Sequence, residues 1–136
     1  MVDAESISAR VERLGPLLGE LERIEAAGHD AYMADFRSRL AAGHAIQLAV
    51  QICIDIGAHL IAERGLETPS DYRGVFVSLG KAGLDDGLAS RLGDAAGMRN
   101  ILVHDYLEVD DDEVWAAIGR LDDLRQFAVF AQRQCD

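Results

Sequence analysis

Residues 45–61 read AIQLAVQICIDIGAHLI, and this stretch decides the fold. Apolar side chains occur on almost every side of a helix drawn through it, so that helix must be buried among others. We expect it to be the latter half of a long helix that runs from about residue 30 to residue 64 and stops at Gly65. Glutamine, aspartate and histidine interrupt the stretch, which is too polar and too short for a membrane span, so no membrane contact is expected.

The rest of the chain also shows helical spacing of its apolar residues and no convincing strand. Turn residues and acidic caps separate the segments, with short connections between them. The pattern predicts an all-α, up-and-down bundle of about five helices. The expected helices are residues 7–27 (with a kink or a new start at Gly15-Pro16), 30–64, 70–79, 85–104 (continuous through Gly97 or broken near it) and 110–132.

Composition limits the classes of function. The 136 residues include 13 Lys and Arg against 24 Asp and Glu, a formal net charge of −11, and 49% are hydrophobic. This length predicts a single domain, residues 1–136 with short flexible ends. The acidic excess opposes general electrostatic capture of nucleic acid, so RNA contact must be local and DNA is not expected. The N-terminus lacks the apolar core of a signal peptide, which predicts a cytoplasmic protein.

A stripe of polar residues runs along the apolar central helix. It consists of His44, Gln47, Gln51, Asp55 and His59, at steps of three and four that keep side chains near one face. Unpaired burial costs about 1–3 kcal/mol per group, so the stripe is either satisfied or exposed, or it lines a cleft or subunit interface. No metal or cofactor is expected, because only Asp55 and His59 have the spacing of a ligand pair and the two cysteines form no motif.

A second cluster, residues 99–106, reads RNILVHDY. Its apolar plug, residues 101–103, is expected to be buried and to hold the flanking polar side chains at the edge of the core. Arg99 and His104 lie about 140° apart on an ideal helix. They therefore converge best if the helix is distorted near Gly97 or if two copies of the chain face each other. By spacing alone, a capped and salt-bridged helix end also explains the cluster.

The spacing of Arg99, His104 and Tyr106 resembles the RX4HXY motif of the HepT-like toxins, a branch of the HEPN ribonuclease superfamily. Residues 45–61 and 69–76 are similar to the family's central helix and the turn that follows, and the likeness spans roughly residues 21–130. The resemblance implies a helical bundle that dimerises to form one composite cleft and cleaves RNA without metal. It also implies an antitoxin with a minimal nucleotidyltransferase fold, which silences the toxin by adding AMP to Tyr106.

The residue types suit that chemistry. Arg99 supplies a permanent cation for the phosphate, and His104 gives or takes a proton near neutral pH. Asn100 orients the phosphate or the imidazole, or else caps a helix turn. Asp55 is expected to hold His104 or Arg99, or it pairs with another arginine. Tyr106 stacks a base, closes the core or carries the AMP group.

Two other hypotheses stay open at this point. A catalytically silent binding module would use the same dimer cleft to hold a nucleotidyltransferase or a nucleotide, and a helical scaffold would need the motif only for structure. The intact arginine, histidine and tyrosine favour the ribonuclease, whereas the acidity favours the module. RNA contact is expected only in a small cleft around Arg99, and the acidic shell, densest at residues 110–113, is expected to solubilise the protein or bind a partner.

Overall fold

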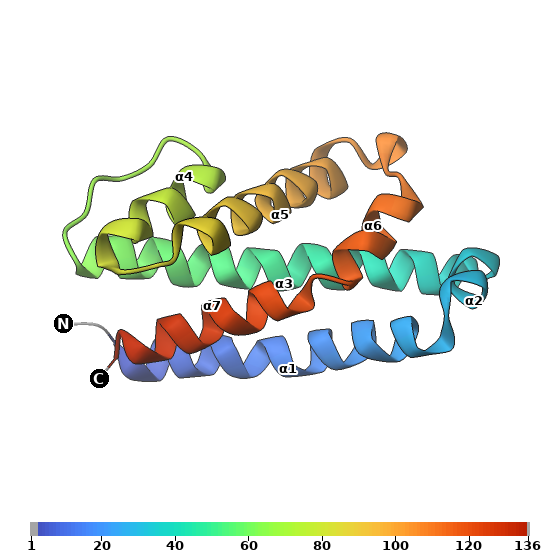
Figure 1. Ribbon diagram of the computed structural model, residues 1–136, viewed down its shortest axis with the longest axis horizontal. Coiled ribbons are helices and arrows are strands. Elements are labelled where there is room, and N and C mark those ends of the chain that lie inside the picture. The colour runs from blue at the N-terminus through green and yellow to red at the C-terminus, as the bar shows by residue number, and fades with distance from the viewer. Residues whose placement is uncertain (1–2, 136) are drawn as a thin grey trace.

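The structure is a computed structural model that describes residues 3–135. The helix that contains residues 45–61 lies at the centre of the molecule (Figure 1). Two long helices, α1 and α7, pack on one side of this central helix, α3, and α4 and α5 cover the other side. The all-α bundle is confirmed, with no strand in the described residues. The α-helices are α1 (Ala4–Ala27), α2 (His29–Ala34), α3 (Phe36–Glu63), α4 (Tyr72–Ser78), α5 (Asp86–His104), α6 (Asp111–Ile118) and α7 (Leu121–Arg133), and the 3₁₀ turns are η1 (Leu79–Ala82) and η2 (Tyr106–Glu108).

Two of the expected helices are each divided in two, which gives seven α-helices within residues 3–135 where about five were expected. The helix expected from residue 30 breaks at Asp35, whose backbone is extended and whose carboxylate accepts hydrogen bonds from Arg37 N and Ser38 Oγ, each at 3.0 Å. This side-chain cap starts α3 anew. The last helix breaks at Gly119, between α6 and α7, and the buried side chains on both sides of the break still face the core.

Two helices continue through residues at which a break was one of the alternatives left open. α1 continues from Ala4 past Pro16, so the alternative of a helix that starts at Pro16 is wrong. Pro16 is exposed, and so is Glu12, the residue whose carbonyl loses its helical donor there. α5 is likewise unbroken at Gly97. The expected start of α5 is confirmed, because the Asp85 carboxylate accepts a hydrogen bond from Leu88 N at 2.9 Å.

α3 supplies the largest part of the core. Cys53 on this helix is fully buried, and burial raises the pKa of its thiol to about 12, so it is a neutral core residue as expected. By length and composition α3 is long and apolar enough to cross a membrane, contrary to the expectation that its stretch 45–61 is too polar and too short. More than half of its most apolar window (56%) is buried inside the fold, so packing against the other helices accounts for its hydropathy.

Gly57 marks the closest approach of α4 to α3. A Cβ atom at this position would lie 2.5 Å from Val75 Cγ1 and 3.3 Å from Leu79 Cδ1. Gly57→Ala should therefore destabilise the protein by about 1–3 kcal/mol, because the branched side chain of Val75 has to move. Urea unfolding measures the change.

Gly19 in α1 provides the matched control. A Cβ atom there meets nothing within 4 Å. Gly19→Ala should raise the free energy of unfolding by up to about 1 kcal/mol, since alanine has the higher helix propensity. Equal effects of the two substitutions would show that helices α3 and α4 do not pack as closely at Gly57 as described.

Candidate active site

The motif residues lie on the last turns of α5. Arg99 is half-buried, Asn100 is exposed, and His104 is the final residue of the helix and is exposed. α5 is regular through Gly97, so the alternative of a distorted helix is wrong, and Arg99 and His104 stay about 140° apart around the axis. One chain alone therefore does not bring the two side chains to one point.

Arg99 is held by two neighbours. Its Nη1 donates to Asn100 Oδ1 at 3.1 Å, and its Cζ lies 5.1 Å from the centroid of the Tyr72 ring at the start of α4. A guanidinium over an aromatic face contributes about 0.5–1 kcal/mol at an exposed site. Arg99 Nε is buried and has no hydrogen-bond partner among the described residues. The side chain is thus oriented, and its Nη2, which is neither buried nor bonded within the described residues, is the donor that a ligand can reach.

His104 has no hydrogen bond or ion pair with any residue in 3–135, so its imidazole is open to a substrate. The apolar plug beside it is less buried than expected. Ile101 is 39% exposed, whereas Leu102 packs against Gly43 of α3. The expectation that residues 101–103 are all buried is wrong, because Leu102 faces α3 and Ile101, one position earlier on the helix, points about 100° away from it.

The polar stripe on α3 is only half covered. Asp55 is exposed and accepts a hydrogen bond from Gln51 Nε2 at 2.8 Å, and no hydrogen bond or ion pair in residues 3–135 joins it to Arg99 or His104. Gln51 Oε1 and His59 Nε2 are buried atoms with no partner in the same part of the chain. The stripe is therefore neither a satisfied core row nor a fully solvated strip.

Tyr106 lies two residues beyond His104, in the short turn η2. It is 71% exposed, and its neighbour Leu107 is 84% exposed. Of the three expected roles, closing the core is therefore wrong for Tyr106. The phenol is free to stack or to be modified.

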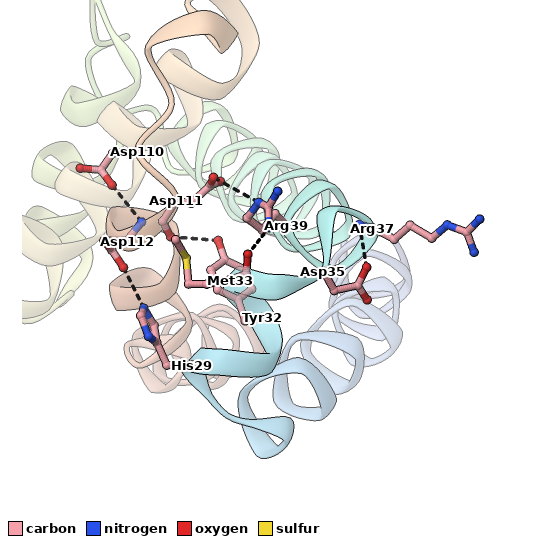
Figure 2. A network of polar contacts seen from close by, with 9 residues as sticks. All are labelled: His29, Tyr32, Met33, Asp35, Arg37, Arg39, Asp110, Asp111 and Asp112. Atoms are coloured by element: carbon pink, nitrogen blue, oxygen red, sulfur yellow. Dashed lines mark hydrogen bonds and ion pairs between the residues drawn. The ribbon is translucent and has the colours of Figure 1, made fainter.

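The chain returns from this turn into α6, whose start is fixed by contacts to α2 and α3 (Figure 2). The buried Tyr32 donates through its hydroxyl to the Asp111 carbonyl at 2.9 Å, and Arg39 pairs with the Asp111 carboxylate at 3.4 Å. His29 Nε2 lies 2.8 Å from Asp112 Oδ1. Burial and, secondarily, the Asp111 carboxylate raise the pKa of Tyr32 to about 12, so its hydroxyl stays a donor. These contacts form the α6 clamp.

The α6 clamp changes the interpretation of the acidic run 110–113. Asp110 caps α6 by accepting from Asp112 N at 2.9 Å, and the next two carboxylates have the cationic or imidazole partners just described. Much of this cluster therefore has a structural role, which the sequence pattern alone did not indicate because His29 and Arg39 are more than 70 residues away.

No group of three or more His, Cys, Asp or Glu side chains within residues 3–135 is arranged to hold a metal ion. Tyr72 was missed as a site residue, because it lies 27 positions from Arg99 and no spacing rule connects them. Its place at the start of a short helix after a proline turn was the available signal.

The chain has relatives among known proteins. Residues 17–131 match the sequence model of the family described as ribonuclease HepT-like. The chain belongs to this family. It is 31% identical over 130 residues to the tRNA nuclease HepT of Aphanizomenon flos-aquae, covering 93% of this chain and 86% of the relative. The ribonuclease class expected from Arg99–Tyr106 is thereby confirmed.

Solved structures agree with the assignment. A toxin–antitoxin crystal structure with AMP-PNP superposes with a TM-score of 0.83 at 26% identity, covering 96% of this chain and 99% of that one. The tri-AMPylated HEPN toxin of Shewanella oneidensis, in complex with its MNT antitoxin, superposes with a TM-score of 0.82 at 27% identity, covering 94% and 96%. The toxin class and the HEPN-like bundle are confirmed together.

Proposed function

We propose that this HepT-like ribonuclease cleaves RNA without metal, in a composite cleft between two copies of the chain, and that AMP on Tyr106 switches it off. The observation that carries the proposal is the state of Arg99, whose guanidinium is oriented by Tyr72 and Asn100 and whose Nη2 donates to no residue within 3–135. Such a preorganised cation suits a phosphate. The relative from Aphanizomenon, named a tRNA nuclease, makes tRNA the first substrate to test.

The reaction assigns one role to each motif residue. His104 takes the 2′-OH proton, the freed oxygen attacks the adjacent phosphorus, and the bond to the 5′-oxygen breaks as that oxygen gains a proton. The products are a cyclic phosphate and a 5′-hydroxyl. Arg99 stabilises the charge that develops on the phosphorane, an effect worth roughly 3–4 kcal/mol per well-placed donor. Asn100 supports Arg99 through the hydrogen bond at 3.1 Å.

The second copy is needed because one chain keeps Arg99 and His104 on different sides of α5. The exposed face of α3 suits that copy. Phe36 is 64% exposed, Leu40 58% and Leu48 39%, and Ile101 of α5 adds another exposed apolar side chain. Between residues 40 and 55 the exposed positions of α3 include a single charge, Asp55. A charge-poor apolar face of this kind is typical of homodimer interfaces.

Pairing of two copies through this face would bring the polar stripe into the subunit interface, where its unpartnered groups can be bonded. Asp55 lies on it, and the partnerless Gln51 Oε1 and His59 Nε2 belong to the same stripe. We place Asp55 as a supporting residue that meets Arg99 or His104 of the other copy, since neither is bonded to it within one chain. The protein acts in the cytoplasm, where RNA and the nucleotidyltransferase antitoxin are both present.

Arg99→Ala and His104→Ala should each lower cleavage by about a hundredfold or more, because each removes a group that acts on the transition state. Purified protein is incubated with tRNA and total RNA in EDTA, and cleavage is followed on gels. Arg13→Ala, an exposed arginine on α1 with no hydrogen bond or ion pair in residues 3–135, serves as the control.

If the wild type leaves RNA intact in EDTA but binds a nucleotidyltransferase, the catalytically silent module is the correct description. The protein's net charge of −11 is the property that would fit a silent binding module.

Leu48→Glu should convert the dimer to a monomer and abolish cleavage, because it places a charge in the apolar interface. Sedimentation velocity measures the association. Val77→Glu on α4, where the valine is 63% exposed, is the matched control and should leave the dimer intact. A Leu48→Glu monomer that still cleaves RNA would refute the composite cleft.

Tyr106 should acquire AMP when the chain is coexpressed with the minimal nucleotidyltransferase of the same organism. The phenol oxygen attacks the α-phosphorus of ATP and pyrophosphate leaves, which adds bulk and negative charge two residues from His104. Mass spectrometry locates the group. Tyr106→Phe should remain unmodified, and so should the peptide with Tyr72, which is also exposed (37%). AMP on another residue, or none, contradicts this switch.

A further inference from the structure

Tyr72 lies between two environments. One is the Arg99 guanidinium, 5.1 Å from the ring centroid. The other is a pocket of about 340 Å³ that opens beside the ring, between α3 and the loop that leads into α4. We call it the Tyr72 pocket; its lining is Ala58, Ile61, Ala62, Thr68, Pro69, Ser70, Asp71, Tyr72 and Val75.

The walls of the Tyr72 pocket are apolar and its loop edge is polar. Ala58 and Ala62 are exposed on α3, and their small side chains leave the space open. Pro69 is held in place by its close approach to Gly74, where a Cβ atom would lie 2.8 Å from Pro69 Cβ. Thr68 and Ser70 add hydroxyl groups. An aromatic face with apolar walls and a few hydrogen-bonding groups at the edge suits a nucleobase.

The position of the pocket indicates which base it takes. A phosphate bound by Arg99 Nη2 would lie near the Tyr72 ring, because the guanidinium carbon is only 5.1 Å from the centroid of that ring. The base of the nucleotide next to this phosphate can enter the pocket, because the same Tyr72 ring lines it. Stacking on an aromatic side chain is a common way for proteins to hold unpaired bases of RNA.

We infer that the Tyr72 pocket binds an unpaired nucleobase of the RNA, adjacent to the phosphate held by Arg99, and so determines where the strand is cut. The inference rests on the proposed ribonuclease function and extends it to substrate selection. It also explains how a chain of net charge −11 holds RNA: a base in an apolar pocket contributes affinity that does not depend on a basic surface.

Ala58→Leu tests the inference by filling the pocket from the exposed face of α3, and Ala62→Leu repeats the test from the next turn. Neither removes an existing contact of Tyr72 or Arg99. With RNA as substrate, each should raise KM about tenfold and leave kcat within about twofold, the size expected for one lost base stack. Ala116→Leu, at an exposed alanine of α6, is the control and should match the wild type.

An RNA oligonucleotide with an abasic residue beside the mapped cleavage point completes the experiment. The wild type should cleave it with the raised KM, and Ala58→Leu should cause no further increase. Unchanged KM in both variants, or an equal penalty on the abasic RNA, overturns the inference. Loss of the dimer in Ala58→Leu, seen by sedimentation, also overturns it, because the alanines would then belong to the subunit interface.

Direct binding separates this inference from the function on which it rests. If the wild type cleaves no RNA, the proposed reaction fails, and fluorescence anisotropy of a labelled single-stranded oligonucleotide still tests the pocket. Weaker binding by Ala58→Leu then supports the base site in a silent module, and equal binding, or no binding by any form, refutes it.

Discussion

Covering α3 is the constraint on which the rest of the structure depends. This helix supplies the largest part of the core, and α1, α5, α4, α6 and α7 all pack against it. α5 must lie along α3 to complete the cover, and α4 packs on both, with Gly57 giving it room. That arrangement brings Tyr72 to Arg99. The site is thus a consequence of how one apolar helix is enclosed.

The sequence predicted the elements of this fold well where periodic burial decides them, as in α3 and α5. It did not predict the breaks at Asp35 and Gly119. One polar cap or one glycine outweighs helix propensity only where the packing of neighbouring helices requires the chain to change direction. Of the two alternatives at Gly97, a continuous or a broken helix, the continuous one is correct, since glycine permits a break without requiring one.

The candidate site was likewise predicted only in part from the sequence. The motif placed Arg99 and His104 on one helix by spacing, and Tyr106 beyond it. No spacing rule predicts contacts between segments that are distant in the sequence. Two such contacts are the packing of Arg99 on Tyr72 and the α6 clamp, in which Asp111 and Asp112 are paired. The acidic run therefore proved partly structural, although exposed ion pairs of this kind contribute only about 0–1 kcal/mol each.

The α6 clamp also shapes what happens at the short connection between α5 and α6. One end of that connection follows the regular helix α5, and the other is tied by the buried Tyr32, while the intervening Tyr106 side chain is mostly exposed. A group attached to this phenol disturbs no packed neighbour. Inactivation by such a route leaves the folded molecule intact, so a cell can keep a stock of silent protein without exposing it to the proteases and chaperones that remove unfolded chains.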